Sequence, residues 1–400
     1  MSVTKYGLTE EVKFCQKCVM SNQRPTSSIE FKHTKEHVHR GLILDDNSVC
    51  DACRYAEMKD KMVDWENREH ELIKLLDKHR KDDGSYDILV PGSGGKDSCF
   101  AAHILKHKYG MHPLTVTWAP HIYTDIGWKN FQQWINVGGF DNMLFSPNGR
   151  VHRLLTRLAF INLLHPFQPF ILGQKNLAPK IALQHDIKLV FYGENEAEYG
   201  NPIADNKSPS RNKKYFAKTN LSEISLGGES FYTLIEKYKL TLNDLSVYLP
   251  PDRDEIENSN IEVHYLGYYV KWTPQEAYYY AVENTGFEAN TERTEGTYTK
   301  FSSLDDRIDG FHYYTTFIKF GIGRATYDAS KDIRNHHISR EEGVALVKKY
   351  DGEFPKRYFS EILEYMDIKE EYFWELVNNA RSPHLWEKID GEWVLKHRVS

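Results

Sequence analysis

Long apolar stretches are missing from this 400-residue sequence. The most apolar run, residues 158–172, contains an asparagine, a histidine and a glutamine and is too short to span a bilayer. The first residues, MSVTKYG, lack the apolar segment that a secretory signal requires. We therefore expect no membrane span and a cytoplasmic location.

A basic excess is also missing, because 51 Lys and Arg residues face 57 Asp and Glu residues and the formal net charge is −6. Proteins that bind nucleic acid usually carry a basic excess or a basic face, so this class is disfavoured. Cysteine is scarce, with five residues, and cytoplasmic cysteines are more often ligands than disulfides. Aromatic residues are plentiful, with 25 Tyr, 20 Phe and 8 Trp, so the chain can bury a sizeable core.

The middle of the chain alternates between strand-like and helix-like patterns. The predicted strands and helices, in chain order, are strand 87–91, helix 98–108, strand 113–118, helix 128–137, strand 142–145, helices 151–164 and 177–185, and strand 187–192. Such alternation predicts an α/β fold whose parallel sheet is covered on both faces.

Four units are expected along the chain. They are a four-cysteine unit at 1–54, a linker at 55–84, an α/β domain at 85–262 with an insertion at 201–262, and a mainly helical region at 263–400. Apolar residues near one helical face predict a single linker helix at about 56–78. Capping boxes that begin at Thr273 and Ser339 mark the start of two later helices.

The most informative segment, residues 91–98 (PGSGGKDS), lies between a predicted strand and a predicted helix. Gly94 and Gly95 let the backbone turn tightly and bring N–H groups close to an anion. The N-terminus of the following helix adds its positive dipole end. The segment 91–98 is not a Walker A loop, because an aspartate follows the lysine. It also lacks the third glycine of a dinucleotide fingerprint.

The polar members of this loop supply the remaining chemistry. Ser93 and Ser98 provide hydroxyl donors, and Lys96 provides a cation for phosphate. Asp97 provides a carboxylate suited to holding Mg²⁺. We therefore expect this segment to be a phosphate-binding loop.

Four of the five cysteines form two CxxC pairs. Cys15 and Cys18 make the first pair, and Cys50 and Cys53 make the second. Two such pairs complete a tetrahedral Zn²⁺ site, with an iron–sulfur cluster and redox dithiols as the alternatives. Four thiolates leave no vacancy on the metal, so we expect the histidines between the pairs to lie on the surface: His33, His37 and His39.

The loop at 93–98 (SGGKDS) resembles the SGGxDS loop of the PP-loop ATP pyrophosphatases. This superfamily includes GMP synthetase, asparagine synthetase, NAD synthetase and several tRNA-modifying enzymes. The resemblance implies a Rossmann-like adenine nucleotide α-hydrolase core. It also implies that ATP is cleaved between its α and β phosphates while the loop holds the departing pyrophosphate.

Further segments are similar to the N-acetyl sugar amidotransferases of bacterial surface-polysaccharide and flagellin-sugar biosynthesis. The match includes the cysteine pairs and covers nearly the whole chain. Its segments are 173–176 (GQKN), 187–195 (IKLVFYGEN), 197–200 (AEYG), 320–326 (FGIGRAT), 328–330 (DAS), 332–334 (DIR), 340–342 (REE) and 350–355 (YDGEFP).

This second resemblance implies conversion of a sugar acetamido group into an acetamidino group, in lipopolysaccharide O-antigen or nonulosonic-acid biosynthesis. ATP would adenylate the amide oxygen of a nucleotide-activated N-acetyl sugar, and ammonia would displace AMP. The ammonia would come from a separate partner, similar to the glutaminase and cyclase subunits of histidine biosynthesis.

Two other functions stay open. A PP-loop tRNA thiolation enzyme would need a sulfur-carrying cysteine and an RNA-binding face, whereas the sequence offers only Cys99 and a basic loop at 206–220. Cys99 is expected to pack in the core. A catalytically silent scaffold would use the cysteine unit to bind partners and would release no pyrophosphate.

Other candidate site residues follow the predicted strand at 187–192 or lie near the C-terminal motifs. Gly193 and Glu194 come at the carboxyl end of that strand, where open α/β sheets bind ligands, and Glu194 is a candidate to hold Mg²⁺ or orient the amide. Lys300, Arg324 and Arg334 are candidates for phosphate or sugar-carboxylate contacts. Arg324 is the preferred one, because it lies next to Gly321 and Gly323.

Overall fold

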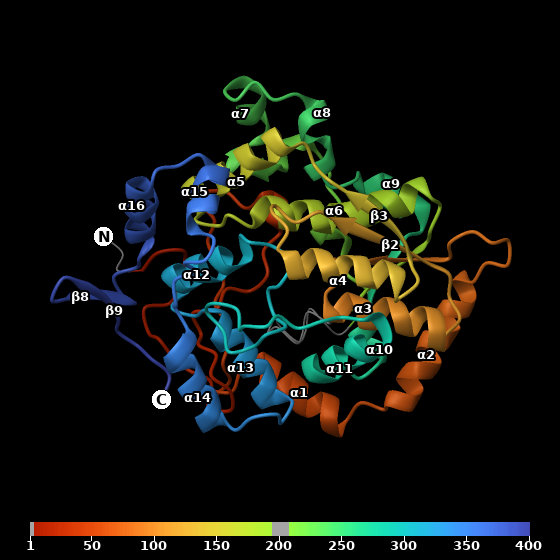
Figure 1. Ribbon diagram of the computed structural model, residues 1–400, viewed down its shortest axis with the longest axis horizontal. Coiled ribbons are helices and arrows are strands. Elements are labelled where there is room, and N and C mark those ends of the chain that lie inside the picture. The colour runs from red at the N-terminus through yellow and green to blue at the C-terminus, as the bar shows by residue number, and fades with distance from the viewer. Residues whose placement is uncertain (1–3, 194–207) are drawn as a thin grey trace.

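A five-stranded parallel sheet lies at the centre of the computed structural model, which describes residues 4–193 and 208–400 (Figure 1). Its order is β3-β2-β1-β4-β7, with every neighbouring pair parallel. The predicted α/β class is therefore confirmed. Because the order reverses between β1 and β4, ligands are expected at the carboxyl ends of these two strands. The strands are β1 (Ile88–Pro91), β2 (Pro113–Trp118), β3 (Asp141–Phe145), β4 (Leu189–Tyr192) and β7 (Glu262–Tyr265).

Alternate residues of the central strands face two different layers of helices, as the pleat of a strand requires. Leu89 and Val190 pack with α5 and α6 on one face. Ile88 and Val90 pack with α2, α3, α4 and α11 on the other face. Both faces are covered, so these strands are continuously apolar. The covering helices are α2 (Trp65–His79), α3 (Lys96–His103), α4 (Asp125–Asn136), α5 (Gly149–Leu163), α6 (Gln168–Gln184) and α11 (Pro274–Thr285).

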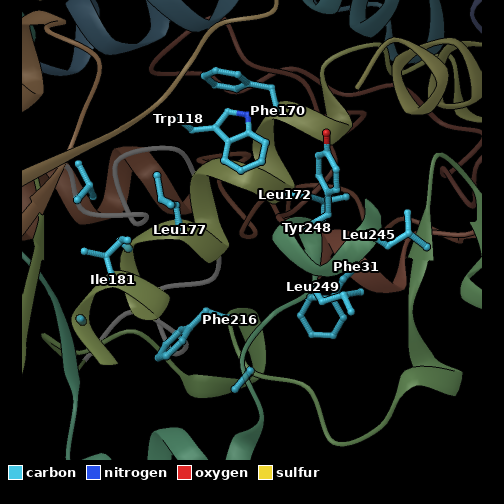
Figure 2. Packing of buried hydrophobic residues seen from close by; sticks show 14 of the residues in the cluster. Phe31, Trp118, Phe170, Leu172, Leu177, Ile181, Phe216, Leu245, Tyr248 and Leu249 are labelled. Atoms are coloured by element: carbon cyan, nitrogen blue, oxygen red, sulfur yellow. The ribbon is translucent and has the colours of Figure 1, made fainter. Parts of the chain in front are cut away.

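The layer around α6 contains large aromatic side chains (Figure 2). Trp118, the last residue of β2, lies against α6 at Gly173, where an added Cβ would come within 2.1 Å of the indole. The Tyr248 ring packs edge-on against the Trp118 ring, with centroids 5.4 Å apart. The motif glycine at 173 is therefore required by the close approach of helix and strand.

The region predicted as an irregular insertion contains several short elements and contributes to the same core. Phe216 and Leu245 from this region are buried in the cluster of Figure 2. The sheet strand β7 follows these elements and was not predicted. The described elements of the insertion are η5 (Lys213–Tyr215), η6 (Leu221–Glu223), β5 (Ser225–Leu226), β6 (Glu229–Ser230), α7 (Phe231–Glu236), α8 (Leu242–Leu245), η7 (Ser246–Tyr248) and α9 (Arg253–Ser259).

The prediction of a single linker helix is wrong. The chain forms α1 (Asp51–Lys61) and α2, separated at Asp64, whose side chain accepts a hydrogen bond from the Asn67 N–H and caps α2. The helix α1 carries a buried lysine, Lys59, whose Nζ donates to the Trp272 carbonyl oxygen at 3.3 Å. Thus α1 connects the cysteine unit to the segment before α11. Similarly, the helix predicted at 98–108 is α3 followed by a π-helical turn, η2 (Ile104–Lys108).

The C-terminal region is mainly helical, as predicted. The Thr273 and Ser339 side chains accept hydrogen bonds from the Glu276 and Glu342 N–H groups at the expected helix starts. A terminal hairpin, which was not predicted, projects from the body in Figure 1. No helix in the described ranges has both the length and the apolar character needed to cross a membrane. A short helix, α10 (Leu266–Tyr269), precedes α11. The elements that follow α11 are α12 (Asp309–Phe320), α13 (Arg324–Arg334), α14 (Arg340–Tyr350), α15 (Phe359–Met366), α16 (Glu370–Ala380), β8 (Trp386–Ile389) and β9 (Glu392–Leu395).

The N-terminal unit before α1 has little regular structure apart from the short turn η1 (Glu30–Lys32). It packs on the C-terminal helices, because its cysteines share one buried cluster with α12, α15 and α16. The Tyr6 hydroxyl donates to the Ala380 carbonyl oxygen at 2.8 Å. The first described residues and the C-terminal region therefore lie on the same side of the molecule (Figure 1).

Candidate active site

The phosphate loop connects β1 to α3 at the carboxyl edge of the sheet. Gly94 has φ +82°, and a Cβ added there would lie 2.8 Å from the Phe131 Cα of α4. Gly95 is the N-cap of α3. A Cβ added to Gly193, which follows β4, would lie 2.9 Å from the Asp97 carbonyl oxygen. The two loops therefore pack backbone to backbone and place the positive end of α3 at the point where the strand order reverses.

The carboxylate of Asp97 is held on both sides. The Lys96 Nζ lies 2.6 Å from one carboxylate oxygen, and the Trp272 indole N–H donates to the other at 3.1 Å. Trp272 is buried, and its ring lies 5.6 Å from the Lys96 Nζ. The carboxylate is suited to Mg²⁺, which prefers oxygen ligands, and Lys96 is placed to neutralise phosphate charge.

Three adjoining cavities surround this loop. The nucleotide-side cavity, about 540 Å³, begins at the loop and passes Gly193. The loop cavity, about 160 Å³, lies between the loop, α4 and Asp305. The histidine cavity, about 240 Å³, adjoins the loop cavity at Arg324, which lines both.

The nucleotide-side cavity has the size and lining expected for a nucleotide. Its volume falls in the range of about 300–1,000 Å³ typical of small-molecule sites. Basic and aromatic side chains line it together with Ser93, Gly95, Asp97 and Ser98 of the loop. The other lining residues that carry charge, an amide or an aromatic ring are Arg24, Glu30, Gln174, Lys175, Tyr192, Arg211 and Tyr265.

Arg324 is the first residue of α13 and is largely buried. Its Nε donates to an Asp328 carboxylate oxygen at 3.1 Å, and its guanidinium lies 4.5 Å from the centre of the Tyr313 ring. These contacts hold the guanidinium between the loop cavity and the histidine cavity. A group that binds across both cavities would therefore meet Arg324.

The N-terminus of α13 is closed by Asp351. Its carboxylate accepts hydrogen bonds from the Gly323 N–H at 2.9 Å and the Thr326 N–H at 3.0 Å. Burial raises the pKa of Asp351 to about 6. The motif segments at 320–326 and 350–355 therefore meet in space, and the second positions the helix that carries Arg324.

The other predicted site residues are placed differently. Lys300 is exposed, donates from Nζ to the Thr291 carbonyl oxygen at 2.8 Å, and lines none of the three cavities. Arg334 is buried on α13. Glu194 lies outside the described residues, as does Lys207 of the basic loop. Their roles stay predictions.

Several residues at the site were missed by the sequence analysis. Asp305 lines the loop cavity beside Ser93 of the phosphate loop, and burial raises its pKa. Arg24 reaches the nucleotide-side cavity from the cysteine unit. Trp272 supports Asp97 from the segment before α11. None of them stands in a recognisable motif, since each is brought to the site by packing between distant segments.

The expected surface position of the histidines between the cysteine pairs is wrong. His33 and His39 are only 6% and 7% exposed. Their rings lie 5.3 Å apart, and each lies within 5 Å of the partly buried His37 ring. His165, after α5, and His312, from α12, extend the group, with ring centres 4.9 Å apart. The expectation failed because it considered only the metal and not the cavity that the same segment lines.

The four paired cysteines converge as predicted. All four are buried, and their sulfur atoms lie within 4.8 Å of one another. The Sγ atoms of Cys15 and Cys53 are 3.8 Å apart, as are those of Cys18 and Cys50. A tetrahedral ion with metal–sulfur distances of about 2.3 Å requires sulfur separations of about 3.8 Å. The donors therefore fit one tetrahedral metal ion.

Cys99 packs in the core behind the phosphate loop. Its thiol is buried and lies 3.4 Å from the Gly94 carbonyl oxygen, and burial raises its pKa to about 12. A neutral thiol is a poor nucleophile. The structure therefore agrees with the packing role expected for Cys99.

Comparisons with known proteins agree with the surface-polysaccharide resemblance in the C-terminal part. Residues 295–400 match the family model described as LPS biosynthesis protein WbpG-like, C-terminal domain. This segment contains Arg324 and Asp351. No curated protein gives a significant match.

Several solved structures are similar in part. The NH3-dependent NAD synthetase from Campylobacter jejuni has 14% identity and a TM-score of 0.29, over 46% of this chain and 77% of that chain. NMN synthetase from Francisella tularensis has 12% identity and a TM-score of 0.27, over 50% of this chain and 93% of that one. The U34-tRNA thiolase NcsA from Methanococcus maripaludis, solved with its [4Fe-4S] cluster, has 11% identity and a TM-score of 0.30, over 84% of this chain and 89% of that chain. Similarities this weak carry no argument about substrate or reaction.

Proposed function

We propose that this protein is an ATP-dependent amidotransferase that converts the acetamido group of a nucleotide-activated N-acetyl sugar into an acetamidino group. The observation that carries the proposal is the phosphate loop at the β1–β4 switch point, with Asp97 facing a cavity of nucleotide size and Lys96 paired with it on the adjoining loop cavity. The match of residues 295–400 to a lipopolysaccharide biosynthesis family supports a sugar as the acceptor.

The reaction divides into two displacements. The amide oxygen of the acceptor attacks the α-phosphorus of ATP, and the bond from that phosphorus to the bridging oxygen breaks, so pyrophosphate leaves with the electron pair. Ammonia then attacks the amide carbon, and AMP leaves with the former amide oxygen. One proton is released with the amidinium product, to pyrophosphate or to solvent.

The chain's own residues act mainly by position and charge. The N-terminus of α3 and Lys96 stabilise the negative charge that builds on the pyrophosphate. Asp97 is the residue to hold Mg²⁺, which would supply further charge neutralisation at the phosphates. Arg324 lies at the far side of the loop cavity, where it can orient the acceptor or stabilise the departing AMP.

In the cysteine unit we propose structural zinc. The four thiol groups match a closed tetrahedral site, which leaves no open position for catalysis. The ion would stabilise the cysteine unit, which has little regular structure of its own. This unit also contributes Arg24 to the lining of the nucleotide-side cavity. Ammonia would come from a separate glutaminase, similar to the subunits of histidine biosynthesis.

The test is AMP and pyrophosphate release by the purified protein with ATP, Mg²⁺ and ammonium. Acceptors are a panel of nucleotide-activated N-acetyl sugars and, separately, bulk tRNA, with mass spectrometry of each acceptor. Replacement of oxygen by NH on one sugar would support the proposal. AMP release with tRNA alone would overturn it in favour of thiolation, and no release with any acceptor would favour the scaffold function.

A matched pair of variants tests whether the phosphate loop is needed for AMP formation. Asp97→Asn keeps the size of the side chain but removes the charge that holds Mg²⁺, so AMP formation should fall by at least about 100-fold, the scale lost when reacting groups are misplaced. Asp83→Asn changes an exposed aspartate before β1 and should leave the rate unchanged. Equal activity in both variants would contradict the role of Asp97.

A further inference from the structure

The histidine cavity is a second binding space beside the phosphate loop. Its walls come from three distant parts of the chain: residues 25–39 of the cysteine unit, the α5–α6 connection, and the helices α12 and α13. It adjoins the loop cavity at Arg324, and Glu30 lines both this cavity and the nucleotide-side cavity. A molecule bound here would therefore lie next to the phosphates of a bound nucleotide.

Uncharged imidazoles of His39, His165 and His312 form part of the polar lining of this cavity, beside several hydroxyl groups. Burial lowers the pKa of His39 to about 2 and of His312 to about 3, and it also lowers the pKa of His165. A neutral imidazole offers one donor and one acceptor. Within the described part of the chain, the Nδ1 atoms of His39 and His312 are buried and have no hydrogen-bond partner. Buried polar atoms are normally hydrogen-bonded, so these two carry an unmet demand for hydrogen bonds beside the cavity.

Positive charge is concentrated on the α12–α13 side of the cavity. Lys319 is 5% exposed, and its ammonium donates to the Leu163 carbonyl oxygen at 2.9 Å. An ammonium has three donors, so further acceptors can join it. Arg324 and Lys331 of α13 line the same wall. Two acidic residues also line the cavity: Glu30, which comes from the cysteine unit, and Asp328, which is already paired with Arg324.

Two simpler occupants fit these features less well. Within residues 4–193 and 208–400, the four cysteines are the one group of three or more potential ligands with atoms within 4.8 Å of one another, so the imidazoles as placed do not converge on a metal ion. An ammonium ion would be repelled by Lys319 and Arg324. A ligand with several hydroxyl or amide groups and a negative charge matches both the imidazoles and the cations.

We propose that the histidine cavity binds the sugar ring of the acceptor, through neutral imidazoles of His39 and His312 and through Lys319, with the acetamido group directed toward Arg324 and the phosphate loop. This inference rests on the proposed function. The cavity, at about 240 Å³, is smaller than sites for whole drug-sized ligands, so it takes one ring and leaves the nucleoside of the carrier outside. Lys319 contacts an anionic group, either a sugar carboxylate or the carrier's diphosphate.

The test compares acceptor kinetics and binding in three variants of the full-length protein. His312→Asn shortens a polar side chain inside the cavity, and Lys319→Met removes its charge at similar length. His103→Asn is the control, because His103 is only partly buried, bonds to the Tyr280 hydroxyl at 2.7 Å and lies outside the cavity. His312→Asn also serves as the second variant if Lys319→Met fails to fold, as judged by its melting curve.

Binding is measured with N-acetylglucosamine, UDP-N-acetylglucosamine and UDP-N-acetylglucosaminuronic acid, and with ATP. We expect His312→Asn to raise the Kd or KM of all three N-acetyl probes at least tenfold, and Lys319→Met to do so for one or both UDP sugars, while the Kd of ATP changes less than twofold. A loss in Lys319→Met seen equally with both UDP sugars assigns Lys319 to the diphosphate. A loss confined to the uronic acid assigns it to the carboxylate.

The inference and the proposed function fail in different ways. Unchanged acceptor binding in both cavity variants, with a wild type that turns the sugar over, overturns the cavity assignment alone. A wild type that binds ATP but neither binds nor turns over any N-acetyl probe overturns both. An equal loss of ATP and acceptor binding in the variants would show a general structural effect and would also overturn the assignment.

Discussion

Gly94 offers a sharp test of how the phosphate loop is built. An alanine at this position must adopt φ near +82°, which costs an L-residue about 1–2 kcal/mol. Its Cβ would also lie 2.8 Å from the Phe131 Cα and 2.9 Å from the Asn130 carbonyl oxygen, whereas ordinary contacts begin at 3.4 Å. Both neighbours are backbone atoms of α4. The loop or the helix must therefore shift by about 0.6 Å or more, and a displacement on this scale costs on the order of 100-fold in rate.

Gly84 supplies the matched control. Its φ is +81°, and a Cβ there meets nothing within 4 Å, so Gly84→Ala carries the backbone strain without the clash. Melting temperature and AMP release are measured for both variants. We expect both to melt a few degrees below the wild type. Only Gly94→Ala should lose AMP formation. Wild-type activity in Gly94→Ala, or an equal loss in Gly84→Ala, would refute the reasoning.

Three further predictions follow from the packing and the charges. Cys18→Ser, or removal of metal by a chelator, should unfold the cysteine unit and lower the melting temperature, as checked by calorimetry alongside metal analysis. Gly173→Ala should destabilise the protein by about 1–3 kcal/mol in urea unfolding, because its Cβ overlaps the Trp118 ring in a filled core. The pKa of Asp351 rises to about 6 on folding, so its stabilising contribution is full below about pH 4 and is lost as the pH rises through 6. The wild type should therefore lose unfolding free energy between pH 4 and pH 6. In Asp351→Asn this loss should be smaller by up to about 3 kcal/mol, and an equal loss in both proteins would contradict the prediction.

Local patterns predicted the centre of the fold because each of its segments carries its own signal. The strands at 88–91 and 113–118 are short apolar runs that must be buried on both faces. The phosphate loop is recognisable because its glycines and polar residues are contiguous. The cysteine pairs are similarly local, and their convergence needs only one hairpin-like return of the chain.

The rest of the site depends on contacts between distant segments, which a single sequence does not show. Trp272 reaches Asp97 across 175 positions. His39 and His312 line the same cavity because the cysteine unit packs on α12. The strand β7 was missed because it follows an irregular stretch, and the break before α2 was missed because Asp64 was not recognised as a cap.

The contacts of Trp272 have a consequence for how metal supply would act on this protein. Its carbonyl oxygen accepts from Lys59 of the helix that follows the second cysteine pair, and its indole donates to Asp97. A chain without the proposed structural metal would lose the anchor of Lys59 and, with it, the alignment of the Asp97 carboxylate. Metal shortage would therefore reduce the number of working molecules and leave the turnover of each loaded molecule unchanged. A titration with metal should give activity that rises in proportion to the loaded fraction, at a constant KM for ATP.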